Sequence, residues 1–192
     1  TGGAGADILH GGAGTNTLFF GTNFSNYGSV SATAGITIVL DGVTAGVGWD
    51  AAGDKYSNFQ NIYLTNLNDS VTGSASNEWF RGLGGADTIN GGGGTDTASY
   101  AGSASVSIGL DGSAGTGGEA AGDRLTNIEI LEGSYNDDTL WGSTGNDTLR
   151  GDIGADTLRG DAGSDTLDGG TGSDTVDYSL TNNAVTVNLL TG

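Results

Sequence analysis

Apolar and polar positions follow a nine-residue period along much of this chain, most regularly between residues 133 and 177. Written in register, this stretch reads GSYNDDTLW, GSTGNDTLR, GDIGADTLR, GDAGSDTLD and GGTGSDTVD. Each unit ends in a short segment whose middle residue is aliphatic. Because successive side chains of a strand point to opposite faces, the pattern predicts three-residue strands with one inward side chain each. The inward residues would be Leu140, Leu149, Leu158, Leu167 and Val176.

The fold predicted from this repeat is all-β: a parallel β-roll, or β-solenoid, without a helix of any length. Turn, strand, turn and strand would form one coil of a flattened spiral per eighteen residues, and each coil would bury its apolar side only against its neighbours. Glycines at the first and fourth positions of each turn are expected to allow positive φ angles and to let the carbonyl groups point inward. These glycines are Gly142, Gly145, Gly151, Gly154, Gly160, Gly163, Gly169 and Gly172.

An Asp closes each turn, so alternate copies are expected to stack their carboxylates in columns, with a spacing of about 4.8 Å per coil. Asp138, Asp156 and Asp174 would lie on one edge, and Asp147 and Asp165 on the other. Such columns repel each other unless cations lie between the carboxylates. Oxygen ligands from carboxylates and carbonyls, without His or Cys, favour calcium over zinc or copper. The sequence therefore predicts several Ca2+ ions at these turns.

Two further arrays have the same register. Residues 2–19 hold two units with Asp7 and Asn16 at the ligand position, and an Asn can still offer one neutral oxygen. Residues 64–99 hold four units, with Asp69, Glu78, Asp87 and Asp96 at that position. The first two of these units have lost turn glycines, which weakens the case for calcium there, whereas the third and fourth match the pattern.

The three arrays, at residues 2–19, 64–99 and 133–177, are joined by longer coils at residues 20–63, 100–132 and 178–192. We expect residues 1–192 to form a single continuous solenoid. Because the chain starts and stops within a repeat, we also expect it to be a fragment of a longer tandem protein.

The longer coils repeat as well. Residues 36–42 (ITIVLDG) match residues 106–112 (VSIGLDG), which suggests a super-repeat of about 80 residues. Alternating apolar residues in both copies favour strands. Three acidic positions recur, namely Asp41, Asp50 and Asp54 in the first copy and Asp111, Glu119 and Asp123 in the second. They form either a solvated acidic loop or an additional calcium site that pins each long loop to the roll.

The pattern G-G-x-G-x-D-x-U-x, with U a large aliphatic residue, resembles the RTX, or haemolysin-type, calcium-binding nonapeptide repeat. The resemblance rests on the five consecutive units between residues 133 and 177. It implies a parallel β-roll in which each calcium sits between two loops on the same edge, one coil apart, with Asp side chains and loop carbonyls as ligands. It also implies export from a Gram-negative bacterium by type I secretion, with folding only on reaching calcium outside the cell.

Composition narrows the choice of function. The 192 residues include 39 Gly and no Cys, and the net charge is −18. Abundant Gly without a three-residue period suits a turn-dense solenoid rather than collagen. Without disulfides, calcium is the obvious staple for an extracellular fold. The negative charge argues against nucleic acid and anionic membranes as partners, and no apolar run is long enough for membrane insertion.

Catalysis finds little support, because the chain has one histidine, His10, and lacks Cys, a Ser–His pair and an HExxH segment. We expect a nonenzymatic, calcium-binding segment of a secreted or cell-surface bacterial protein, such as an adhesin, an S-layer protein or a large RTX exoprotein. The alternative is the noncatalytic C-terminal module of a secreted metalloprotease, lipase or alginate-modifying enzyme. Self-association also stays open, as does glycan binding by a patch of Trp79, Trp141, Arg150 and Arg159.

Overall fold

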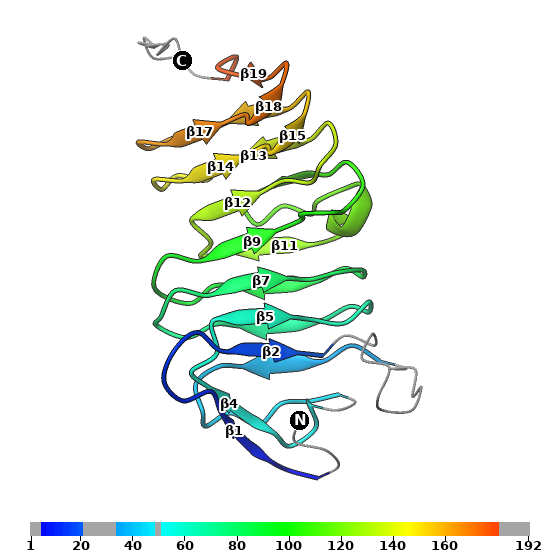
Figure 1. The fold of residues 1–192 in the computed structure, drawn as a ribbon, viewed down its shortest axis with the longest axis vertical. Helices are drawn as coiled ribbons and strands as arrows, with labels where there is room; N and C mark the ends of the chain where they lie inside the picture. Colours follow the sequence, from blue (N-terminus) through cyan, green and yellow to red (C-terminus); the bar gives the residue numbers. More distant parts are fainter. Residues whose placement is uncertain (1–4, 21–33, 49–50, 181–192) are drawn as a thin grey trace.

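The structure is a computed structural model that describes residues 5–20, 34–48 and 51–180. Its strands lie one above another in a tall stack that begins with β1 and ends with β19 (Figure 1). Most strands are three residues long, and only one short 3-10 turn, η2 (Gly118–Ala120), occurs among the named elements. The strands are β1 (Ile8–His10), β2 (Thr17–Phe19), β3 (Thr37–Val39), β4 (Lys55–Ser57), β5 (Asn61–Tyr63), β6 (Ser70–Thr72), β7 (Trp79–Arg81), β8 (Thr88–Asn90), β9 (Thr97–Ser99), β10 (Ser107–Gly109), β11 (Arg124–Thr126), β12 (Ile130–Glu132), β13 (Thr139–Trp141), β14 (Thr148–Arg150), β15 (Ile153–Gly154), β16 (Thr157–Arg159), β17 (Thr166–Asp168), β18 (Thr171–Gly172) and β19 (Thr175–Val176).

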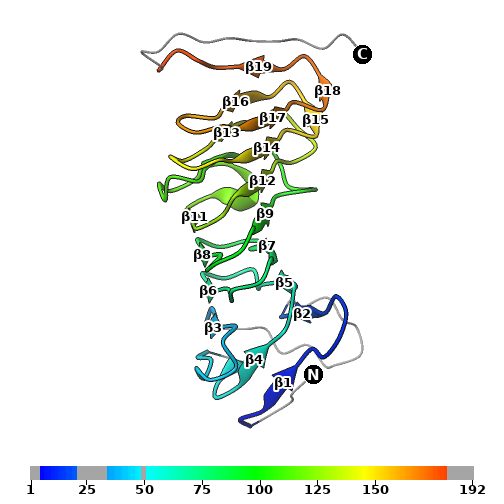
Figure 2. The same cartoon turned by 90° about the vertical axis from the view of Figure 1, so that its left-hand side faces the viewer.

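Most strands lie in two walls of parallel sheet, which face each other across the core (Figure 2), and the remaining four pair as β1-β4 and β15-β18. The first wall is a seven-stranded sheet in the order β17-β14-β12-β9-β7-β5-β2. The second wall consists of the sheets β11-β8-β6-β3 and β10-β13-β16-β19. Within the 64–99 and 133–177 arrays, strands eighteen residues apart pair with each other, as Leu140 pairs with Leu158. The predicted all-β roll of parallel strands is therefore confirmed.

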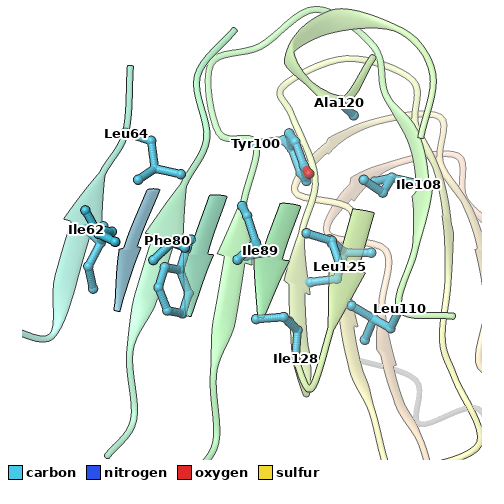
Figure 3. Close-up of a cluster of buried hydrophobic side chains, with 14 of the residues drawn as sticks. Ile62, Leu64, Phe80, Ile89, Tyr100, Ile108, Leu110, Ala120, Leu125 and Ile128 are labelled. Atoms are coloured by element: carbon cyan, nitrogen blue, oxygen red, sulfur yellow. The ribbon is translucent and has the colours of Figure 1, made fainter. Parts of the chain in front are cut away.

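The core is built from the middle side chains of most strands and, near the links, from further buried residues such as Leu64, Tyr100 and Leu110 (Figure 3). Leu140, Leu149 and Leu158 are buried, as is Phe80 in β7, while their strand neighbours are more exposed. Leu167 is partly buried, and Val176 is exposed in β19, the last strand of its sheet. Each regular coil of the 133–177 array thus adds only two inward side chains, so the core is thin there.

Both long links leave the plain spiral in the same way. In the second link, β10 pairs with β13, three strands further along the chain, while the later strand β11 returns to pair with β8. The segment between them runs antiparallel to β10 through the bridge from Ser107 to Thr116. The first link repeats this arrangement, with β3 on β6, β4 on β1, and a bridge from Thr37 to Val47.

The hydrogen bonds of the two links also correspond. Gly46 N donates to Asp54 O at 2.7 Å, and Gly115 N donates to Asp123 O at 2.9 Å. These equivalent positions lie 69 residues apart, whereas Asp7 and Asp87, whose N–H groups donate to Asp54 and Asp123, lie 80 residues apart, as expected from the sequence. The difference arises because the first link contains extra residues that the second lacks.

In the part of the chain that the structure describes, no helix has the length and apolar character needed to span a bilayer.

Candidate metal sites on the loop edges

Because the strands of both walls are parallel, the loops between them collect on two edges. Loops that lead into the second wall form edge A, and loops that lead into the first wall form edge B. In the regular coils each loop has six residues: a first residue that is usually Gly, four variable residues, and an acidic sixth residue directly before the strand. The sixth residues of one edge therefore lie above one another, one coil apart.

The predicted carboxylate columns are present and are connected by hydrogen bonds. On edge A, Asp156 Oδ1 accepts from the backbone N–H of Asp138 at 2.8 Å, and Asp174 Oδ1 accepts from that of Asp156 at 3.0 Å. On edge B, Asp165 Oδ1 accepts from the N–H of Asp147 at 3.0 Å. Each carboxylate therefore reaches back to the preceding loop on its edge.

The same arrangement holds in the 64–99 array. Asp87 Oδ1 accepts from the N–H of Asp69 at 2.8 Å, and Asp96 Oδ1 accepts from the N–H of Glu78 at 2.7 Å. In the first array, Asp7 N donates to Asp54 Oδ1 at 2.8 Å. All sequence-predicted acidic residues of the arrays consequently lie at edge positions in the columns.

Several of these carboxylates keep one oxygen without a partner. The Oδ2 atoms of Asp87, Asp96 and Asp156 are buried and accept no hydrogen bond, and the same is true of Asp7 Oδ2. A buried carboxylate oxygen that lacks a partner is costly, and charged groups in such places are normally paired or bound to a metal. These oxygens fit a hard cation, which would supply the missing positive charge.

The electrostatic environment leads to the same conclusion. Burial raises the pKa of Asp87 to about 8. The hydrogen bond from Asp69 N opposes this rise, and the charges of Asp123 and Asp69 add to it. Burial likewise raises the pKa of Asp96 to about 7 and that of Asp123 to about 6. The pKa of Asp156 is also raised, mainly by burial. Without a cation the folded chain therefore holds these carboxylates in their charged form only at an energetic cost.

Around Asn16, loop carbonyl groups converge on one side chain. Its Nδ2 lies 3.3 Å from Gly12 O, 3.0 Å from Gly14 O and 3.2 Å from Asn58 O. Three carbonyl oxygens from two turns on one edge thus surround a single atom. The sequence predicted that Asn16 would offer an oxygen to calcium, but here its amide donates to the carbonyls that a cation would otherwise contact.

The glycines act differently at the two predicted positions. At the fourth position, Gly154, Gly163 and Gly172 have positive φ angles of 151°, 137° and 148°, as expected. The first-position glycines are not among the positive-φ residues, so the predicted reason for them is wrong. They are required because the loop carboxylate and the next loop's backbone approach the Cα closely. A Cβ on Gly151 would collide with Asp156 Oδ2 and lie 2.7 Å from Gly169 O.

The acidic residues of the links do not come together as one site. Asp41 and Asp111 follow strands of the second wall and accept hydrogen bonds within exposed turns, from Thr44 and Ser113 respectively. Asp123 precedes β11 of that wall, so it lies at the opposite edge, and Asp54 precedes β4 of the two-stranded sheet β1-β4. Glu119 pairs with Arg81 at 3.2 Å, and Asp50 lies outside the described residues. Within the described ranges, no three His, Cys, Asp or Glu side chains converge on one point.

Asp123 instead completes the edge A column of the second array. Its Oδ1 accepts from the N–H of Asp87 at 2.7 Å, and its Oδ2 accepts from the buried hydroxyl of Tyr100 at 2.9 Å. Both of its oxygens are therefore used by the protein.

Sequence analysis missed two column members at the short turns of edge B. Glu129 Oε2 accepts from Asp96 N at 2.9 Å, and Gln60 Oε1 accepts from Asn16 N at 3.0 Å. Both residues stand two positions before an inward side chain, Leu131 or Ile62, just as the Asp does in each regular unit. The register of the inward residues was the signal that could have found them.

Parallel strands in stacked sheets, joined by Gly- and Asp-rich loops whose carboxylates form columns, define a calcium-binding β-roll. The family model described as RTX calcium-binding nonapeptide repeat (4 copies) matches residues 1–23, 63–98, 126–158, 141–176 and 150–183. These matches cover more than half of the chain, which therefore belongs to the RTX calcium-binding repeat family. A comparison with curated proteins gave no match.

Proposed function

We propose that this chain is a structural segment of a secreted or cell-surface bacterial protein, an adhesin, S-layer protein or large RTX exoprotein, that folds when it binds calcium. The observation that carries the proposal is the set of buried carboxylate oxygens without partners on both edges, at Asp87 and Asp156 on edge A and Asp96 on edge B. A calcium ion at each such oxygen would turn a repulsive column into a bridge between successive coils.

Calcium also explains how one chain can stay unfolded inside the cell and fold outside it. The regular coils of the 133–177 array add only two inward side chains each, and the net charge is −18, so burial alone has to overcome both chain entropy and charge repulsion. Extracellular calcium modules have dissociation constants of about 10⁻⁴ to 10⁻³ M, far above cytosolic calcium. Binding free energy then becomes folding free energy after type I secretion.

The surface argues for a structural role rather than for a single glycan-binding patch. Trp79 and Arg150 lie on the first wall, in β7 and β14, which β9 and β12 separate. Trp141 and Arg159 lie on the second wall, where the Arg159 guanidinium is 5.9 Å from the Trp141 ring centre. His10, the histidine considered for catalysis, is exposed, and its Nδ1 forms a hydrogen bond with Ser57 Oγ at 2.9 Å. The four residues considered for glycan binding are thus divided between two faces.

Equilibrium calcium binding, measured by isothermal titration calorimetry, tests this proposal. We expect saturable binding of several ions with apparent dissociation constants of about 10⁻⁴ to 10⁻³ M, and no comparable binding of magnesium, which demands a tighter octahedral shell. A chain that binds no calcium at millimolar concentration would rule the proposal out.

A further inference from the structure

The edge loops fall into two kinds, which the sequence repeat does not distinguish. In the first kind a hydroxyl side chain holds the acidic residue four positions later. Ser143 N and Oγ donate to Asp147 Oδ2 at 2.6 and 3.0 Å, and the Thr65 hydroxyl lies within 3.0 Å of both oxygens of Asp69. We call these the hydroxyl loops, which are residues 64–69, 73–78, 133–138 and 142–147, with Thr65, Ser74, Ser134 and Ser143 as their second residues.

The hydroxyl in these loops also fixes the turn itself. Ser143 Oγ accepts from Gly145 N at 3.1 Å, and Ser134 Oγ accepts from Asn136 N at 3.1 Å. Neither the second nor the fourth residue of any hydroxyl loop has a positive φ angle. Even Gly145, at the fourth position, is absent from the positive-φ residues, so its conformation follows the loop kind and not the residue type.

In the second kind of loop, the second and fourth residues both have left-handed backbone. In the 64–99 and 133–177 arrays we call these the glycine loops, which are residues 82–87, 91–96, 151–156, 160–165 and 169–174. The left-handed second residue is Leu83, Gly92, Asp152, Asp161 or Gly170, and the fourth is always Gly. None of these second residues has a hydroxyl. Asp87, Asp96 and Asp156, which close three of these loops, are the buried carboxylates whose Oδ2 has no partner.

Position in the stack separates the two kinds within the 64–99 and 133–177 arrays, whereas the loop at residues 11–16 is left-handed at Gly12 and Gly14 although it begins its array on edge B. Each hydroxyl loop is the first regular loop of its array on its edge, and each glycine loop follows another regular loop one coil below. On edge A, the carboxylate of a first loop reaches back to a link, because no regular loop lies one coil below it. Asp69 Oδ1 accepts from Ile36 N at 2.7 Å, and Asp138 Oδ1 accepts from Val106 N at 2.8 Å.

We infer that the four hydroxyl loops are metal-free starting caps and that calcium is held by the carboxylates of the five glycine loops. The caps hold their carboxylates with protein hydroxyl and N–H groups, so the column can begin without an ion beneath it. The carboxylates that would hold calcium are Asp87, Asp96, Asp156, Asp165 and Asp174. This inference rests on the proposed function, because it assumes that the roll binds calcium.

Two consecutive loops on edge B give a matched test. We would count bound calcium by equilibrium dialysis for the whole chain and for the variants Asp147→Asn and Asp165→Asn. Asp165→Asn should lose one ion, whereas Asp147→Asn should keep the full number. Loss of one ion from both variants, or from Asp147→Asn alone, would overturn the inference and leave the proposed function standing. No calcium on the unchanged chain would overturn both.

A second variant keeps the test decisive if Asp147→Asn does not fold. Ser143→Ala removes the hydroxyl and leaves the carboxylate in place, while Ser164→Ala changes an exposed residue of the next glycine loop. At saturating calcium, Ser143→Ala should melt several degrees below the unchanged chain with the same number of ions, and Ser164→Ala should change neither quantity. An ion lost from Ser143→Ala, or a melting temperature that does not fall, would show that the hydroxyl is not a substitute for a metal.

Discussion

Chelating calcium with EDTA at pH 7.5 is expected to convert the folded chain to a largely unstructured one, with loss of its far-UV β signal. A ligand at a hundred times its dissociation constant stabilises the folded state by about 2.7 kcal/mol per site. Several such sites together match the whole stability of an ordinary domain, which is about 5 to 15 kcal/mol. The thin core and the repelling carboxylate columns cannot replace the stabilisation that calcium binding supplies.

Circular dichroism during titration from EDTA into calcium is the measurement, with magnesium as the control cation. We expect a steep transition with calcium and none at equal magnesium. If the β signal is complete in EDTA, the aliphatic core alone holds the roll, and the role assigned to calcium is wrong.

Acid should partly replace calcium in the chelated chain. The pKa values of Asp87, Asp96 and Asp123 are raised by burial from an ordinary 3.8 to about 8, 7 and 6. Such groups favour the folded state fully below the ordinary pKa, and this contribution is lost as the pH rises through the raised values. In EDTA the β signal should therefore grow as the pH falls from about 8 to about 4. A signal independent of pH would contradict the burial of these carboxylates.

Replacing Gly142 by Ala is expected to destabilise the calcium-loaded chain by about 2 to 3 kcal/mol, as for overpacking of a filled site. The added Cβ would collide with Gly160 O and lie 2.8 Å from Asp147 Oδ2. Both oxygens belong to the edge B column, so the two loops must move apart. Urea unfolding at saturating calcium measures the change in the free energy of unfolding.

Gly145→Ala is the matched control within the same loop. Its Cβ would meet only Ser143 Oγ at 3.5 Å and Asp147 Oδ1 at 3.8 Å, which are ordinary contacts, and its backbone is not left-handed. We expect no loss of stability there, because Ala reduces the freedom of the unfolded chain. Equal destabilisation by both variants would show that the loop needs flexibility rather than space at its first residue.

The sequence alone was sufficient to predict the β-roll because its nine-residue period determines the geometry of each coil. A nine-residue unit with one aliphatic residue determines which side chains are inward, such as Leu149, and which acidic residues stack, such as Asp147 and Asp165. The links were harder to predict. Antiparallel return segments place β11 beside β8 although β10 comes first in the chain, and no local pattern encodes that pairing.

The sequence predicted which acidic residues form the candidate site, but not which of them the protein already holds by its own hydrogen bonds. Pattern matching treats Asp138 and Asp156 alike, yet a neighbouring Ser holds the first and no group pairs with Oδ2 of the second. The difference depends on what lies one coil below, which is a tertiary property. Glu129 was missed because its turn is too short to show the motif, although it stands in the same register before Leu131.

The most direct test of calcium as the bond between coils is to locate it in crystals grown with calcium, using long-wavelength anomalous X-ray scattering. We predict anomalous peaks beside the Oδ2 atoms of Asp87, Asp96, Asp156, Asp165 and Asp174. A folded roll without peaks at these carboxylates, or with peaks only at the exposed Asp41 and Asp111, would contradict the account.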